Sequence, residues 1–167
     1  MLDGIHKIHL IGIGGSGMRA IANILIQKGY DVSGSDIAES AVISKFRDMG
    51  ATVHIGHNKE YVNGVDAIVR STAIREDNPE IVAAKEQGIT ILHRSDIVKA
   101  VLDVTDGIAV AGAHGKTSTT SMIGQILVEA NADPTVIIGG EVDYLKGSSC
   151  LGKGHFSVVE ADESDGS

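Results

Sequence analysis

Two glycine-rich segments hold the residues whose types and spacing could do chemistry. Residues 12–17, Gly-Ile-Gly-Gly-Ser-Gly, fit the pattern G-x-G-x-x-G. Glycines at this spacing permit a tight turn and let backbone N–H groups approach a diphosphate at the positive end of a helix. Asp36 lies 19 residues beyond Gly17, where an acid can accept hydrogen bonds from a ribose hydroxyl. The segment predicts a nucleotide or dinucleotide site; the alternative is a turn whose glycines only let a strand pack closely on a helix.

The second segment, residues 112–118 with the sequence Gly-Ala-His-Gly-Lys-Thr-Ser, is similar to a phosphate loop. The full pattern is G-x-x-x-x-G-K-[ST], and Val110 stands here at its first glycine position. Backbone N–H groups around Gly115 could still cradle phosphate, Lys116 could reach the terminal phosphates and Thr117 could ligate Mg²⁺. The alternative is a lysine at an ordinary helix N-terminus, but the helix dipole disfavours a cation there unless an anion is bound. The segment predicts binding of ATP or GTP.

Polar residues that directly follow short apolar runs are further candidates for ligand or metal binding. Glu160 comes first after residues 156–159, and an acid at the carboxyl end of a strand beside a phosphate loop is placed to bind Mg²⁺. A solvated acidic tail is the alternative, since the last eight residues carry four acids and no base. Ser71 and Thr72 follow another apolar run, and in an open parallel sheet they would face the same crevice as the first loop. Their alternative role is to cap a local turn.

Strands that alternate with helices must position these residues. Apolar runs predict strands at 6–12, 30–35, 52–54, 66–69 and 89–92, separated by helices at 16–29, 38–49, 77–88 and 95–102. A second series follows, with strands at 107–111, 135–138 and 156–159, a helix at 116–130, and a loop or excursion at 139–155. This alternation indicates an α/β fold with a doubly wound parallel sheet. We expect a first domain at 1–104 and an incomplete second domain at 105–167, because three strands would leave apolar faces uncovered.

The composition excludes several classes of protein. The chain has 167 residues and a net charge of −8, which argues against general binding of nucleic acid. No apolar run is long enough to cross a bilayer, and no secretory signal is visible, so we expect no membrane partner and a cytoplasmic location. Cys150 is the single cysteine and cannot form a disulfide framework. His54 and His57 are interpreted as loop residues, since no cluster of acids or cysteines nearby completes a metal site.

Several motifs together resemble those of the Mur ligases over nearly the whole chain. The most specific are Ala111-Gly-Ala-His-Gly-Lys-Thr-Ser-Thr-Thr120 and Val159-Glu-Ala-Asp-Glu-Ser-Asp165. They are joined by His9-Leu-Ile-Gly-Ile-Gly-Gly-Ser-Gly-Met18, Ser33-Gly-Ser-Asp36 and Ser71-Thr-Ala-Ile74. The resemblance implies a Rossmann-like domain for a UDP-sugar, followed by the start of a P-loop α/β ATPase domain. It also implies ATP and Mg²⁺ as cofactors and the joining of L-alanine to the carboxylate of UDP-N-acetylmuramate through an acyl phosphate.

The resemblance assigns roles to individual residues. The UDP-sugar would be bound by Gly14, Gly15, Ser16, Gly17, Asp36, Ser71 and Thr72. The ATP phosphates would be wrapped by Gly112, Ala113, His114, Gly115, Lys116, Thr117 and Ser118. Lys116 would be the catalytic residue that stabilises charge on the transferred group, and Thr117 and Glu160 would bind Mg²⁺.

Three points stay open at the level of the sequence. Arg19 departs from the small residue expected after Gly-Met, and would either contact phosphate or lie on the surface. We expect the fragment alone to be incompetent for turnover, because the family's remaining site residues lie further along the chain. The alternative functions are an NAD-dependent oxidoreductase, which leaves Gly115-Lys116-Thr117 unexplained, and a nucleotide-binding module without chemistry.

Overall fold

The computed structural model describes residues 2–161, which divide into two compact units, Leu2–Arg94 and residues 95–161. Each unit has its own sheet, and each is described separately below. The domain boundary expected at 104/105 stays a prediction. Among residues 2–161, none of the helices combines the length and apolar character needed to cross a bilayer.

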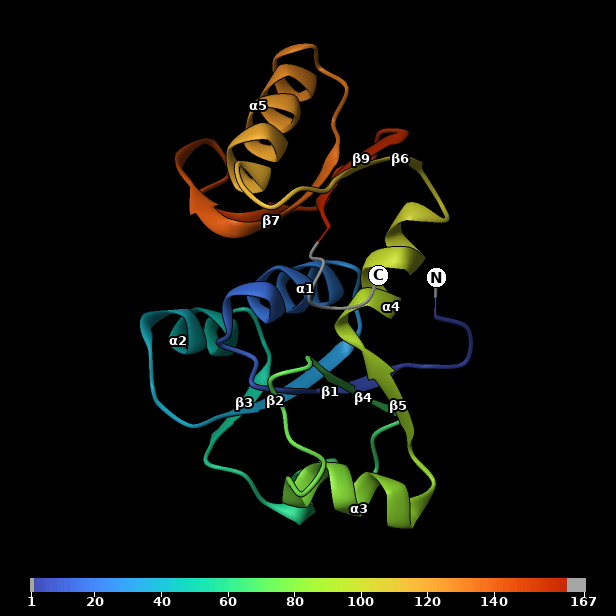
Figure 1. Ribbon diagram of the computed structural model, residues 1–167. Coiled ribbons are helices and arrows are strands. Elements are labelled where there is room, and N and C mark those ends of the chain that lie inside the picture. Colours follow the sequence, from blue (N-terminus) through green and yellow to red (C-terminus); the bar gives the residue numbers. More distant parts are fainter. Residues whose placement is uncertain (1, 162–167) are drawn as a thin grey trace. The chain divides into compact units, whose positions relative to one another are not determined.

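The first unit is a five-stranded parallel sheet with helices on both faces (Figure 1). The strand order β3-β2-β1-β4-β5 reverses direction between β1 and β4, and ligands bind such sheets at the carboxyl ends of the strands near this point. In Figure 1, α1 and α2 cover one face and α3 covers the other. The elements are β1 (Lys7–Ile11), α1 (Ser16–Gln27), β2 (Asp31–Asp36), α2 (Ala41–Asp48), β3 (Thr52–Ile55), the 3₁₀ helix η1 (Lys59–Val62), β4 (Ala67–Arg70), α3 (Pro79–Gln87) and β5 (Thr90–His93).

Apolar side chains on both faces of the central strands form the core of this unit. Ile8 and Leu10 of β1 and Ile68 of β4 are fully buried, as expected for a parallel sheet covered on both sides. In α1, Ile21 and Leu25 recur at helical spacing and are fully buried. The core therefore fixes the carboxyl ends of β1, β2 and β4 beside one another.

Up to residue 161, the second unit contains a four-stranded mixed sheet with the order β6-β9-β7-β8. β9 pairs in parallel with β6 and β7, whereas β8 pairs antiparallel with β7. The helix α5 contacts β6, β7 and β9 (Figure 1). The elements are α4 (Arg94–Leu102), which begins at the last residue of the first unit, β6 (Asp106–Val110), α5 (Lys116–Glu129), β7 (Thr135–Val142), the 3₁₀ helix η2 (Asp143–Leu145), β8 (Gly147–Cys150) and β9 (Phe156–Glu160).

The predicted fold class and the predicted order of helices and strands are confirmed, with two corrections. The segment 139–155, expected to be a loop or an excursion, is a loop only in part, because β7 continues to Val142 and β8 follows. As a result the second unit has four strands among the described residues, and not three. The helix expected from residue 38 begins at Ala41, because the Ser40 hydroxyl accepts a hydrogen bond from the N–H of Ile43 at 3.4 Å and caps the helix there.

Candidate nucleotide-binding sites

The first glycine loop joins β1 to α1 and is held by the end of β2. The carbonyl of Ser35 accepts hydrogen bonds from the N–H groups of Gly12, at 2.8 Å, and Ile13, at 3.0 Å. Gly12 has a φ of +73°, a backbone conformation that side chains disfavour. The N–H of Gly15 donates to the carbonyl of Gly12 at 2.9 Å and closes the turn. The loop is thus shaped by backbone contacts that need no ligand.

The N-terminus of α1 can receive an anion. Gly15 is the N-cap residue and has no side chain to cap the helix, and the first turn contains no acidic residue. Gly15 and Ser16 are exposed, and the first N–H groups of a helix have no intrahelical acceptor. Together with the helix dipole these groups favour a phosphate. The structure places the predicted residues Gly14, Gly15, Ser16 and Gly17 here.

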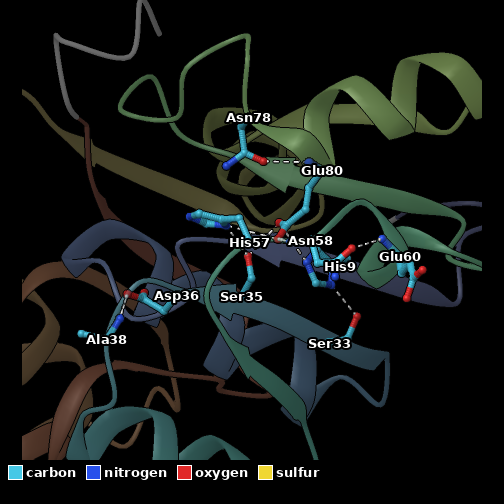
Figure 2. A network of polar contacts seen from close by, with 10 residues as sticks. All are labelled: His9, Ser33, Ser35, Asp36, Ala38, His57, Asn58, Glu60, Asn78 and Glu80. Carbon is cyan, nitrogen blue, oxygen red and sulfur yellow. Dashed lines mark hydrogen bonds and ion pairs between the residues drawn. The ribbon is translucent and has the colours of Figure 1, made fainter.

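Asp36 is the last residue of β2 and contacts the loop directly. Its Oδ2 atom accepts a hydrogen bond from the N–H of Gly14 at 2.8 Å, and its Oδ1 atom lies 3.5 Å from the N–H nitrogen of Ala38 (Figure 2). A methyl group on Gly14 would come within 2.9 Å of Oδ2, so a larger residue here would displace the Asp36 carboxylate from this hydrogen bond. The carboxylate therefore fixes the loop, a role that the sequence did not indicate. Its contact with a ribose hydroxyl stays a prediction.

Ser71 and Thr72 begin a turn directly after β4, the strand that pairs with β1. The carbonyl of Ser71 accepts a hydrogen bond from the N–H of Ile74 at 3.2 Å. A methyl group on Gly12 would lie 3.4 Å from Cδ1 of Ile74, so this turn lies against the glycine loop. Ser71 is half-buried and Thr72 is exposed. The structure therefore brings both residues to the edge of the sheet that carries the first loop.

Two arginines also contact the first loop. The Nε–H of Arg19 donates to the carbonyl of Gly14 at 2.7 Å, so this side chain braces the loop. The guanidinium of Arg94 lies beside Gly17, in the space that a methyl group on Gly17 would fill. Sequence reasoning missed Arg94, although a basic residue directly after a strand was a visible signal. Both guanidinium groups add positive charge near the N-terminus of α1.

A buried polar cluster lies between β1, β2 and α3 (Figure 2). Its centre is Glu80, which is fully buried, as are His9 and Ser35. One carboxylate oxygen of Glu80 accepts from the Ser35 hydroxyl at 2.7 Å and lies 3.3 Å from Nε2 of His9. The other lies 3.2 Å from Nδ1 of His57 and accepts from the N–H of Asn58 at 3.2 Å. Sequence reasoning missed this cluster.

Burial, more than the charges of the cluster, shifts the pKa of the neighbouring His54. The His54 ring, in β3, stacks on Tyr61 with the ring centroids 4.0 Å apart. Burial lowers the pKa of His54, the charge of His9 lowers it further, and the carboxylate of Glu80 acts in the opposite direction. Among the residues that the structure describes, no three histidine, cysteine or acidic residues gather where they could hold a metal ion.

The second glycine loop joins β6 to α5. Gly112 has a φ of +148° and Gly115, the N-cap residue of α5, has a φ of +77°, so both use conformations that suit glycine. The ammonium group of Lys116 donates to the carbonyl of Gly112 at 2.8 Å and therefore folds back over the loop. Ala113, His114 and Ser118 are exposed beside it. The N-terminus of α5 has no capping side chain and no acid in its first turn, which again suits an anion.

Glu160, the last residue of β9, contacts Thr117, and binding of Mg²⁺ by these two residues stays a prediction. The Thr117 hydroxyl lies 3.1 Å from both carboxylate oxygens of Glu160 and donates to this carboxylate. The N–H of Gly139 donates to Oε2 of Glu160 at 2.7 Å and fixes its orientation. A hydroxyl and a carboxylate are the hard oxygen ligands that Mg²⁺ prefers, so these residues fit the ion. The acids at 162, 163 and 165 lie outside the described residues.

The two loops and their strands define an α/β protein with two candidate phosphate-binding loops, and comparison with known proteins shows its family. Residues 7–104 match the family model described as "Mur ligase family, catalytic domain". The chain belongs to the Mur ligase family.

Named relatives agree with this assignment. The chain is 47% identical over 167 residues to a UDP-N-acetylmuramate–L-alanine ligase of Solidesulfovibrio magneticus, and 49% identical over 163 residues to one of Desulfotalea psychrophila. These alignments cover 100% and 97% of the chain, but 36% of each relative. The crystal structure of UDP-N-acetylmuramate-alanine ligase MurC from Thermotoga maritima matches with a TM-score of 0.87 at 36% identity, over 94% of this chain and 37% of that one. The chain therefore spans about a third of the length of these ligases.

Proposed function

We propose that this chain is the substrate-binding part of an ATP-dependent ligase that joins L-alanine to UDP-N-acetylmuramate during peptidoglycan precursor synthesis. In this proposal the first unit binds the UDP-sugar and the second unit binds ATP with Mg²⁺. Because the chain covers 36% of its curated relatives, the ligation is proposed for the whole-length enzyme and the two binding steps for this chain. We also propose that the ligase works in the cytoplasm.

The observation that supports this function best is the pair of uncapped helix N-termini, each preceded by a glycine loop. α1 opens after a loop of the dinucleotide type, and α5 opens after a Gly-Lys-Thr loop. An NAD-dependent enzyme would need only the first of these loops. A ligase that activates a nucleotide-linked carboxylate needs both, because two of its three substrates, the UDP-sugar and ATP, carry a chain of phosphates.

The proposed reaction has two steps. The carboxylate of the muramoyl group takes the γ-phosphoryl group of ATP, which gives an acyl phosphate and ADP. The amine of L-alanine then attacks the acyl carbon and expels phosphate, which leaves an amide. Such phosphoryl transfer depends on positioning and on neutralising charge, with little covalent chemistry by the protein.

The residues of the second unit have distinct tasks in this scheme. The N–H groups of residues 112–118 hold the ATP phosphates, and the Lys116 ammonium leaves the carbonyl of Gly112 to pair with the terminal phosphates. Thr117 and Glu160 would hold Mg²⁺, which supplies positive charge beside the phosphates when it is bound. In the first unit, Gly14, Gly15, Ser16 and Gly17 bind the diphosphate, while Asp36, Ser71 and Thr72 line the rest of the UDP site.

Calorimetric titration of the 167-residue chain tests the two binding steps. We expect saturable binding of UDP-N-acetylmuramate, and of ATP in the presence of Mg²⁺, each with one site per chain. NAD serves as the competing ligand for the first loop. Binding of NAD together with no binding of UDP-N-acetylmuramate would overturn the proposal.

A further inference from the structure

The carboxylate of Glu80 is buried at the start of α3, yet no step of the proposed reaction uses it. Its side chain is fully buried, and the two oxygens together meet the Ser35 hydroxyl, His9, His57 and the N–H of Asn58 at 2.7 to 3.3 Å (Figure 2). An isolated buried carboxylate is costly, and only several hydrogen bonds compensate for the loss of water. Burial of this carboxylate therefore depends on the four hydrogen-bonding groups around it.

The surroundings of Glu80 keep it ionised. Burial raises the pKa of its carboxyl group, but the hydrogen bonds from His9, Ser35 and His57 and the charge of His9 outweigh burial, so the net pKa lies below its ordinary value. An ionised carboxylate accepts stronger hydrogen bonds than a neutral group. The Ser35 hydroxyl is therefore held in one orientation.

Ser35 connects this cluster to the first glycine loop. Its hydroxyl donates to Glu80 on the side of α3, while its carbonyl accepts from the N–H groups of Gly12 and Ile13. The next residue, Asp36, accepts from the N–H of Gly14. A short path of hydrogen bonds thus runs from Glu80 through the end of β2 to three consecutive amides of the loop.

The sequence of β2 agrees with a positioning role. Central strands of parallel sheets are usually near-continuous runs of Val, Ile and Leu, whereas β2 reads Asp-Val-Ser-Gly-Ser-Asp. Ser33 and Ser35 point to the side of the cluster, where Ser33 lies 2.8 Å from Nδ1 of His9. Packing alone gives no reason for two hydroxyls at these places.

We propose that Glu80 is a positioning residue of the nucleotide site, which fixes Ser35 and through it the N–H groups of the first glycine loop. This inference rests on the proposed binding of a uridine nucleotide by the first unit. A loop held in its binding geometry loses less conformational freedom when it binds the diphosphate. Loss of the anchor therefore weakens binding without removing any group that touches the ligand.

The test measures UDP binding by the 167-residue chain and by three variants, Glu80→Gln, Ser35→Ala and the double variant. Titrations are made at a temperature at which circular dichroism shows each variant fully folded, so that unfolding does not contribute. We expect the dissociation constant for UDP to rise about tenfold in Glu80→Gln, which is the scale of one charged hydrogen bond. Because Glu80 acts through Ser35, the double variant binds no more weakly than Glu80→Gln does.

Two measurements separate positioning from a merely structural role. The amide NMR signals of Gly12 and Ile13 shift in Glu80→Gln, because their common acceptor, the Ser35 carbonyl, has moved. The affinity for ATP with Mg²⁺ stays unchanged, since those residues belong to the second unit. Glu60→Gln, the same substitution at an exposed residue close to the cluster, leaves both UDP affinity and the two amide signals unchanged.

The outcomes that contradict the inference are distinct from failure of the proposed function. If folded Glu80→Gln binds UDP as tightly as the unsubstituted chain does, the positioning role of Glu80 is wrong. UDP binding by the unsubstituted chain would in that case still support the proposed function. If Glu80→Gln does not fold, the test relies on Ser35→Ala. Unchanged UDP affinity in Ser35→Ala would contradict the inference in the same way. No UDP binding by the unsubstituted chain would overturn the function and the inference together.

Discussion

At the scale of single residues, Asp36 and Glu160 occupy equivalent places in the two units. Each is the last residue of a parallel strand, and each accepts a hydrogen bond from a glycine N–H, Gly14 at 2.8 Å and Gly139 at 2.7 Å. A carboxylate that is fixed in this way keeps further lone pairs for a ligand. The two units thus use one arrangement beside two different loops.

Residue types and spacing predicted the residues of the second glycine loop more fully than those around the first. The pairing of Thr117 with Glu160 follows from the order strand, loop, helix and acid-ended strand, because parallel strands end at one edge. Glu80 was not predictable, since an acid in the first turn of a helix is ordinary and is usually explained by the helix dipole. Only the fold shows that this acid points into the sheet toward Ser35.

The first prediction concerns Lys116. Replacing it with alanine should weaken binding of ATP with Mg²⁺ by about tenfold or more, because a charge-assisted contact to the phosphates is lost. Binding of UDP-N-acetylmuramate should be unchanged, since Lys116 belongs to the other unit. Calorimetry measures both affinities, with Lys153→Ala at an exposed position of the same unit as control. An equal loss of both affinities would contradict two separable sites.

A second prediction follows from the lowered pKa of His54. Its ordinary pKa is 6.5 and the folded state lowers it, so the unfolded chain takes up the proton first as the pH falls. The free energy of unfolding of the first unit should therefore decline as the pH drops below about 6.5, the unperturbed histidine value. His54→Phe keeps a ring to stack on Tyr61 and should reduce this decline. Urea denaturation at several pH values measures the free energy of unfolding. If it falls with pH as steeply in His54→Phe as in the unsubstituted chain, His54 is not the cause of the decline.

At the scale of elements, hydrophobic runs predicted almost every strand and helix, and β8 shows where this reasoning fails. Its sequence, Gly-Ser-Ser-Cys, has neither an apolar run nor an alternating pattern. The strand forms because β7 pairs with β9 along one edge only and offers its other edge to β8, so that Val136 lies opposite Cys150 and Ile137 opposite Ser149. Residues 147–150 form a strand because they pair with β7, and a short stretch of sequence does not show which neighbour a segment will pair with.

The third prediction concerns the packing of β2 against β1. A methyl group at Gly34 would lie 2.8 Å from Cδ1 of Ile13 and 2.9 Å from the carbonyl oxygen of Leu10, closer than real contacts allow. Gly34→Ala should therefore destabilise the first unit by about 1–3 kcal/mol, the usual effect of overpacking. Gly147→Ala is the matched control, because its methyl group meets no atom within 4 Å. Thermal denaturation compares the two, and equal melting temperatures would contradict the close approach.

At the scale of the whole molecule, an acidic chain is proposed to bind two polyphosphates. The net charge of −8 opposes both ligands, so binding depends on local features that reverse the sign of the field. These features are the uncapped N-termini of α1 and α5, the guanidinium groups beside the first loop, and Lys116. Each unit therefore carries its own means of binding phosphate.

The last prediction follows from this division of the chain. UDP should slow the amide hydrogen exchange of residues 12–17 and leave residues 112–118 unaffected, and ATP with Mg²⁺ should do the reverse. The reason is that each nucleotide satisfies N–H groups of only one helix N-terminus, and exchange slows where those groups gain an acceptor. Mass spectrometry of peptides from the two loops measures the effect, and in Lys116→Ala the protection by ATP should be lost while the protection by UDP remains. Protection of both loops by either nucleotide alone would show that the two sites are not independent, and the assignment of one polyphosphate to each unit would then be wrong.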